Sequence, residues 1–346
     1  MPAEVEPLPR SSFRHPLQIV WAFALTGALA ACIGADRSAS GEPALSDPAS
    51  LPPASLASGK RLSVVATTSI VADVVGAIGG DSIDLHALVP PGVDPHAFEP
   101  TPQDLGRAAG ADVVFLNGFG LDGRLAETLA AAAVHAPLVS LSQGITPLTL
   151  EEEHPGGSDP GGIDPHTWLD PNNLLVWVDN AAAALSALEP AHAAGFAERA
   201  SGYAASLRAL DAEIRQMLQA VPPQDRRLVT DHDEFGYFAR RYGFTIVGTV
   251  IPGFSTGSEP SPQELASLEQ AIRDLHVAAI FISSVVTPDL AERVAEDTGV
   301  RLVTLYAHSL SGPGGPASDY LSLMRYNVAA IVEALSPQAA GDGSAP

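Results

Sequence analysis

Two histidines of this chain stand in nearly the same short motif. His96 lies in D-P-H-A-F-E-P at residues 94–100, and His166 lies in D-P-H-T-W-L-D-P at residues 164–171. In each motif the proline before the histidine fixes one backbone dihedral, and the closing proline disfavours a helix through the motif. We therefore expect both imidazoles on stiff loops, and neutral imidazole is the commonest protein metal ligand. Either motif alone fits an ordinary proline-rich turn, but the pair favours a metal site.

Two further histidines follow predicted strands in the second half of the chain. His232 comes after a strand expected at residues 227–230, and His308 comes after one expected at residues 301–305. Ligands of open α/β sheets bind beyond the carboxyl ends of the strands, so all four histidines are expected there, two from each half of the chain. A strand-end histidine can instead cap a neighbouring helix, which is the alternative for His308.

Four imidazoles without a cysteine suit a borderline divalent ion. Zn²⁺ favours tetrahedral nitrogen sites, whereas Mn²⁺, the alternative, prefers oxygen donors. Because four protein ligands leave no open position on the ion for activating water, the pattern indicates capture of a metal and not catalysis.

The hydrophobic pattern predicts the elements that carry these loops. Strands expected at residues 62–68, 83–89 and 111–116 alternate with helices, and a second α/β series starts after residue 222. Such alternation is typical of a parallel sheet covered by helices. An alanine-rich helix expected from residue 190 to about 218 would span about 40 Å, long enough to brace two lobes. The predicted fold class is α/β: two lobes with central, mainly parallel sheets, joined by a long rigid helix, with the metal site between the lobes.

At 346 residues the chain is long enough for two domains, which composition shifts help to delimit. The expected organisation is a signal peptide at 1–31, a flexible tether at 32–60, an N-terminal lobe at 61–189, a linking long helix at 190–221, a C-terminal lobe at 222–336 and a disordered tail at 337–346.

The net charge of −22 argues against nucleic acid as a partner, because phosphates require a basic surface. It is compatible with cations, although many acidic proteins use such a surface only for solubility.

The N-terminus has the pattern of an export signal. Arg10 and Arg14 precede an apolar run from Leu17 to Ala31, which ends L-A-A-C at Cys32. This end resembles a bacterial lipobox, which implies cleavage before Cys32 and acylation of its thiol, so that the mature protein is tethered outside a membrane. A plain secretory signal or an uncut anchor is the alternative, but the run is shorter than the about 20 residues of a membrane span.

Five motifs between about Leu62 and Leu335 resemble one known family. They are V-V-A-T-T-S-I-V-A-D, P-G-V-D-P-H-A-F-E-P-T-P, D-P-H-T-W-L-D-P, T-D-H-D-E-F-G-Y-F-A-R-R-Y-G and D-Y-L-S-L-M-R-Y-N. The sequence is similar to the metal-binding lipoproteins of bacterial ABC importers for zinc or manganese, the cluster A-I solute-binding proteins. The resemblance implies two α/β lobes joined by a rigid helix, one metal buried between them, no enzymatic activity, and an extracytoplasmic, lipid-anchored monomer that serves an ABC permease and its ATPase.

The resemblance also implies ligands. His96 and His166 match the first-lobe ligands, and His232 matches the third, where members have His or Glu and a histidine resembles the zinc type. The fourth ligand is usually an aspartate in T-D-S, where this chain has A-H-S; we expect His308 to bind in its place. A second departure is Ile282-Ser283-Ser284, where many relatives have an acidic residue before the serines; its absence removes one residue that could orient a ligating histidine. The loop before the second motif is short, with His154 alone, and a His-rich collecting loop is not expected.

Three alternatives to a zinc receptor remain open. One is a manganese-specific receptor of the same family. Another is a zinc-dependent hydrolase with Glu234 or Asp231 as general base, although hydrolytic sites generally keep three protein ligands and an open position. The third is an adhesin that carries the metal structurally and acts in cell adhesion; an extended exposed apolar patch would favour it.

Overall fold

The computed structural model describes residues 44–132, 135–149 and 162–336. Cys32, the predicted signal peptide, His154 and the tail from residue 337 lie outside these ranges, so the statements about them stay predictions. Within the described ranges, no helix has the length and apolar character that a membrane crossing requires.

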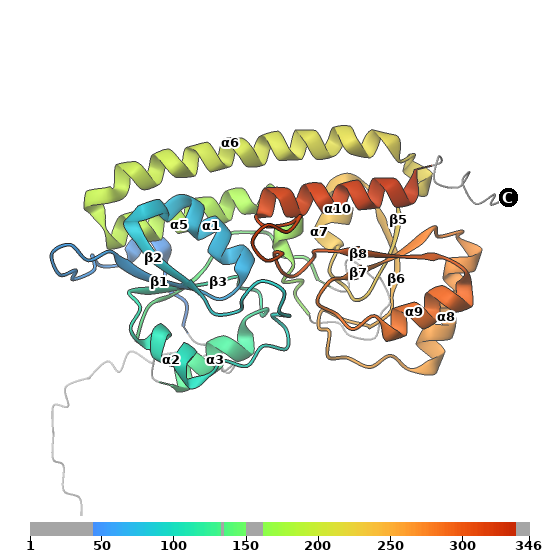
Figure 1. Cartoon of the computed structure of the whole chain (residues 1–346), viewed down its shortest axis with the longest axis horizontal. Coiled ribbons are helices and arrows are strands. Elements are labelled where there is room, and N and C mark those ends of the chain that lie inside the picture. Colours follow the sequence, from blue (N-terminus) through green and yellow to red (C-terminus); the bar gives the residue numbers. More distant parts are fainter. Residues whose placement is uncertain (1–43, 133–134, 150–161, 337–346) are drawn as a thin grey trace, which may run out of the picture. The chain divides into compact units, whose positions relative to one another are not determined.

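The N-terminal lobe is built on a four-stranded parallel sheet with strand order β2-β1-β3-β4. Its strands are β1 (Leu62–Ala66), β2 (Ile83–Ala87), β3 (Val113–Leu116) and β4 (Leu138–Ser140). Helices α1 (Ser69–Gly79) and α5 (Asn173–Leu188) cover one face, and α2 (Pro102–Ala109) and α3 (Gly123–Ala131) cover the other (Figure 1). Successive residues of β1 show why both faces are apolar: Val64 packs in the cluster that contains α1 and α5, and Val65 packs with α2 and α3.

The C-terminal lobe repeats this plan with strand order β6-β5-β7-β8, and all three strand pairs are parallel. Its strands are β5 (Arg227–Thr230), β6 (Thr245–Thr249), β7 (Ala279–Ser283) and β8 (Arg301–Leu305). Its helices are α7 (Gly236–Tyr242), α8 (Pro262–Asp274), α9 (Asp289–Thr298) and α10 (Tyr320–Leu335). Helices α8 and α9 pack on the face that contains Val229 and Ile280, and α10 packs on the opposite face with Phe281.

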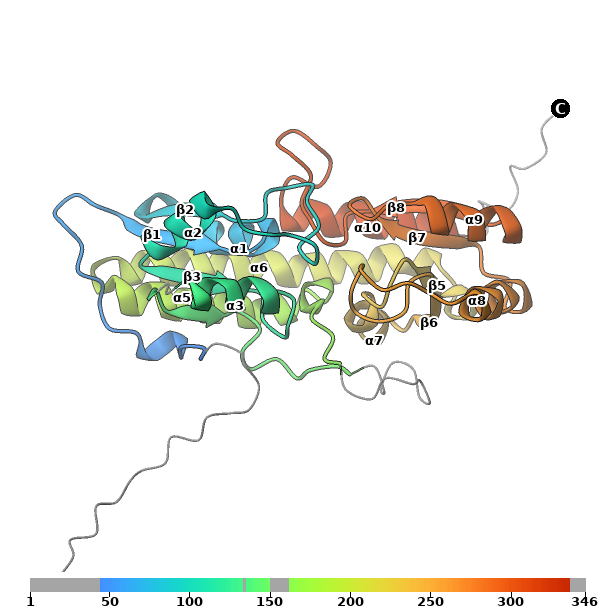
Figure 2. The same ribbon diagram turned by 90° about the horizontal axis from the view of Figure 1, so that it is seen from below.

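The predicted long helix is present as α6 (Ala193–Met217), with a 3-10 turn at each end (Pro190–His192 and Leu218–Ala220). Figure 2 shows it running past both sheets. It contacts α1 and α5 in the first lobe and α10 in the second. Its buried stripe, which includes Phe196, Leu207 and Ile214, belongs to one apolar cluster that continues through both lobes. The helix therefore fixes the carboxyl edges of the two sheets beside each other.

Residues 46–56 pack on the N-terminal lobe, although the sequence pattern places them in a flexible tether. Asp47 caps a 3-10 turn at Pro48–Ser50, and Leu51 is buried. The backbone N–H of Ala54 donates to the carbonyl of Leu188 at 2.8 Å. The lobe therefore begins before residue 61. Composition alone misses this packing because a single buried leucine in a proline-rich segment produces no hydrophobic period.

Candidate metal centre

All four predicted histidines lie in loops beyond the carboxyl ends of the strands. His232 and His308 follow β5 and β8 directly, whereas His96 and His166 lie further along the loops that leave β2 and β4. The loop of His96 ends at a helix start that the sequence predicts, since Thr101 caps α2 in a reciprocal pair with Asp104. Two rings thus come from each lobe, and each is held by structure at both ends of its loop.

The four imidazole rings converge on one point. Every pair of ring centroids is separated by 4.7 to 5.4 Å. One ring nitrogen of each histidine lies within 4.8 Å of the others. The Nε2 atoms of His96 and His166 are 3.2 Å apart. Two donors that each lie about 2.1 Å from one ion are about 3.0 Å apart at a right angle and about 3.4 Å apart at the tetrahedral angle. The distance between the two Nε2 atoms therefore matches that of two donors on a single ion.

Two aspartates orient two of these rings. The carboxylate of Asp164 accepts a hydrogen bond from His166 Nδ1 at 2.8 Å, and that of Asp231 accepts one from His232 Nδ1 at 2.7 Å. Since Nδ1 carries the hydrogen, the lone pair of each ring is on Nε2, toward the centre. Sequence reasoning did not assign this role to either aspartate. The signal was present, because each acid stands one or two residues before its histidine.

His308 is oriented from another strand. Its Nδ1 lies 2.9 Å from the hydroxyl of Ser283, which is buried at the end of β7. Ser283 stands in the I-S-S segment that departs from the family pattern, where the loss of an acidic partner was expected. The acidic residue is absent, as the sequence shows, and the serine hydroxyl takes the place of a partner for this ring.

The surroundings keep three of the rings, those of His96, His166 and His308, neutral. Burial, followed by the neighbouring histidines, holds the pKa values of His166 and His308 well below the usual histidine range. Loss of solvation, followed by proximity to His232, lowers the pKa of His96 to about 3. Neutral imidazoles are the form that binds a metal ion, so no proton has to leave these three rings at neutral pH.

Glu234 contributes a carboxylate to the same centre. Its side chain is 1% exposed, and its Oε2 lies 3.0 Å from Nε2 of His308. Burial, reinforced by the carboxylate of Asp231, raises the pKa of Glu234 well above its usual value. An acid in this position is destabilised when ionised unless a cation lies nearby.

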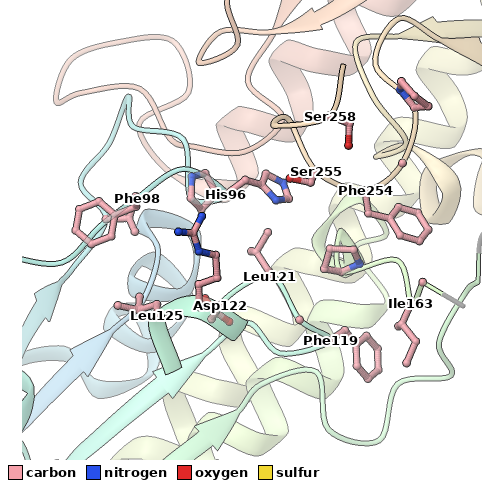
Figure 3. Close-up of a pocket in the computed structure, with 18 residues that line it drawn as sticks. His96, Phe98, Phe119, Leu121, Asp122, Leu125, Ile163, Phe254, Ser255 and Ser258 are labelled. Carbon is pink, nitrogen blue, oxygen red and sulfur yellow. The ribbon is translucent and has the colours of Figure 1, made fainter. Parts of the chain in front are cut away.

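His96 differs from the other three histidines in its exposure. It is half-buried, whereas the other three rings are buried. It lies in the wall of a cavity of about 500 Å³ between residues of the first lobe and the segment 252–258 of the second. Figure 3 shows His96 among Phe98 and Leu121 of its own lobe, with Phe254 on the far side. His96 is the histidine of the four that lines this cavity.

The family model for the zinc-uptake complex component A, a periplasmic protein, matches residues 64–334. The iron-binding protein YfeA of Yersinia pestis is 33% identical over 275 residues, covering 79% of this chain and 86% of the relative. The manganese ABC transporter substrate-binding lipoprotein PsaA of Streptococcus anginosus is 32% identical over 287 residues, covering 81% of this chain and 91% of the relative.

Solved structures agree with the two-lobe architecture. The periplasmic zinc binding protein TroA of Treponema pallidum has a TM-score of 0.73 and 30% identity, covering 80% of this chain and 100% of that chain. A Cd-bound periplasmic metal binding protein from Candidatus Liberibacter asiaticus has a TM-score of 0.69 and 26% identity over the same shares of the two chains.

These similarities confirm the predicted fold class and the resemblance seen in the motifs, and they exclude the hydrolase. The matches run from β1 into α10, through both sheets and the helix between them. The chain therefore belongs to the family of the periplasmic zinc-uptake complex component A, as an extracytoplasmic, metal-binding substrate-binding protein of the ABC-transporter type and not as an enzyme.

Proposed function

We propose that this protein is the zinc receptor of an ABC importer, which holds one Zn²⁺ among His96, His166, His232 and His308 and delivers it to a membrane permease driven by an ATPase. The observation that carries the proposal is the convergence of the four rings, with one nitrogen of each within 4.8 Å of the others. Neutral nitrogen donors on oriented rings suit Zn²⁺ better than the harder Mn²⁺.

The division of the donors between two lobes supports a role in transport. His96 and His166 belong to the first lobe, and His232 and His308 belong to the second. A movement of one lobe relative to the other would separate the two pairs of histidines and so weaken metal binding. The permease can therefore obtain the ion by acting on the protein surface, without entering the buried centre.

Manganese is the main alternative cargo. PsaA is named for manganese and YfeA for iron, so relatives of similar identity differ in their metal. The four imidazole nitrogens disfavour manganese, because Mn²⁺ prefers oxygen donors.

Membrane attachment through Cys32 and a monomeric state are part of the same proposal. The relative PsaA is named a lipoprotein, and L-A-A-C at residues 29–32 is the matching signal here. Replacing Cys32 with serine should move the protein out of the membrane fraction or leave it unprocessed. Unchanged partitioning would contradict the anchor.

An adhesin that carries the metal structurally has little support. Among the described residues, the large apolar side chains that are exposed are Leu45, Ile163 and Leu275. Three such residues do not make the extended patch that a protein–protein contact of this kind would use.

Metal competition on the purified protein tests the proposal. Protein purified without added metal should contain about one zinc per chain, as a single four-ligand site requires. After chelation, titration with Zn²⁺ and Mn²⁺ together should load zinc. Preferential loading of manganese would overturn the assignment of zinc, and binding of neither ion would overturn the receptor.

A further inference from the structure

A site of four imidazole ligands does not explain why the carboxylate of Glu234 is buried beside them. The side chain is 1% exposed, and neither carboxylate oxygen accepts a hydrogen bond from a donor among the described residues. The residue follows His232 by two positions, in the loop between β5 and α7. A buried carboxylate without donors is costly, and proteins keep such groups where a cation or a ligand pairs with them.

The neighbouring Asp231 offers an ionised Glu234 no hydrogen-bond donor, and its contact with Glu234 raises the pKa of Glu234. Asp231 uses one oxygen to accept from the N–H groups of His232 and the other to accept from Ser283 N at 2.6 Å. It is therefore a second negative group beside Glu234. His308 Nε2 is 3.0 Å away, but Nε2 is also the ring nitrogen that remains for a metal, because Nδ1 faces the hydroxyl of Ser283.

The distances fit a shared ion. Atoms of Asp231, His232 and Glu234 lie within 4.8 Å of one another, and His232 also belongs to the four-histidine cluster. The 3.0 Å between Glu234 Oε2 and His308 Nε2 matches two donors at a right angle on one ion, each about 2.1 Å from it. A right angle between donors occurs in five-coordinate and six-coordinate sites and not in tetrahedral ones.

We propose that Glu234 is a fifth ligand, so that the centre offers four imidazole nitrogens and one carboxylate oxygen to the metal. This rests on the proposed function, since it concerns the same ion. The oxygen donor adds a negative charge and a harder ligand to a nitrogen site. Mn²⁺ and Fe²⁺ gain more from such a ligand than Zn²⁺, which four nitrogens already satisfy. Glu234 is therefore the residue that sets how far the receptor accepts harder ions.

The test is Glu234→Gln, which keeps the shape of the side chain and removes its charge. Chelator-treated parent and variant are titrated with Zn²⁺ and with Mn²⁺. We expect the variant to bind Mn²⁺ at least about 10-fold more weakly, and Zn²⁺ no more than about 3-fold more weakly, so that the zinc-to-manganese affinity ratio rises. An unchanged ratio would overturn the fifth ligand, because an acid that only orients His308 would affect both ions alike.

Cobalt gives a second readout that depends on coordination number. Co²⁺ in the parent should show the weaker visible absorption of a five-coordinate ion, and the variant should show the stronger absorption of a tetrahedral one. Identical spectra would also overturn the proposal.

Asp122→Asn is the matched control. Asp122 is a buried carboxylate of the first lobe that accepts a hydrogen bond from Gly118 N, and it is not part of the histidine cluster. Its replacement should change neither the affinity ratio nor the cobalt spectrum. The titration of the parent protein tests the proposed zinc receptor, and the comparison of variant with parent tests Glu234 as fifth ligand. Either proposal can therefore fail without the other.

Discussion

The two lobes supply two histidines each, but they orient them differently. In the first lobe, the acid that begins each D-P-H motif accepts a hydrogen bond from the backbone N–H of its histidine, at 2.9 Å for His96 and 2.8 Å for His166. In the second lobe, His308 depends on Ser283, which belongs to a different strand. Both first-lobe histidines and His232, which contacts the adjacent Asp231, are thus held by local sequence, whereas His308 requires a correctly assembled sheet.

The same motif also gives different results within the first lobe. Asp164 binds both the backbone and Nδ1 of His166, whose ring is buried. Asp94 binds the backbone of His96 with one oxygen and accepts from Thr256 of the second lobe with the other, at 2.8 Å. His166 is therefore fixed within its own lobe, whereas the His96 loop is tied across the cavity.

Acidification should destabilise the metal-free protein, and this is the largest effect that we expect. In an unfolded chain histidine binds a proton near about pH 6.5, whereas burial holds the pKa values of His166 and His308 far lower in the fold. Below pH 6.5 the unfolded state binds more protons, so stability falls as the pH falls. The two rings together should cost about 3 kcal/mol between pH 6.5 and 5.

Urea denaturation of chelator-treated protein at the two pH values measures this loss. Replacing the exposed His135 with glutamine should leave the difference unchanged. Equal stability at both pH values would show that the centre does not disfavour protonation.

His166→Ala should reduce zinc affinity more than His96→Ala does. The buried ring leaves a gap enclosed by protein, and we expect a loss of more than about 100-fold. His96 borders the cavity, so water can take its place on the ion and the loss should be smaller. Competition with a zinc-binding dye gives both constants, and the reverse order would contradict the distinction between the rings.

His308→Ala should weaken zinc binding about 10 to 100-fold, because it removes one of the four nitrogen donors. His308→Asp should recover most of the affinity, with more tolerance for manganese, since it supplies an oxygen donor. Titrating the three proteins side by side decides the point. Equal affinity in His308→Ala and the parent would remove His308 from the ligands.

Asp164→Asn should weaken zinc binding by about 10-fold, because it removes the carboxylate that fixes the tautomer of His166. Asp94→Asn should have a smaller effect, since Asp94 binds only the backbone of His96 and Thr256. Zinc affinity of the two variants is the measurement. Equal losses of zinc affinity in the two variants would mean that the hydrogen bond from each aspartate to the backbone of its histidine matters, and that the contact of Asp164 with the His166 ring adds nothing.

Local patterns predicted much of the fold because they are read within single elements. The β-branched runs of β1 and β7, the helix starts at Thr101-Pro102 and Ser261-Pro262, and the apolar stripe of α6 all depend on neighbours a few residues apart. Strand β4, with three residues, is too short for such a pattern, and no strand is predicted there.

The sequence by itself determined which side chains are the candidate metal ligands. Proline-bounded loops and strand ends placed four imidazoles at the carboxyl edges of two sheets. Only the tertiary structure decided their partners. Ser283 meets His308, and Glu234 turns toward the same ring, because the strand order places β7 between β5 and β8. The packing of α6 on both lobes sets the distance between the two pairs of histidines. Such contacts join residues far apart in the chain, and no local propensity encodes them.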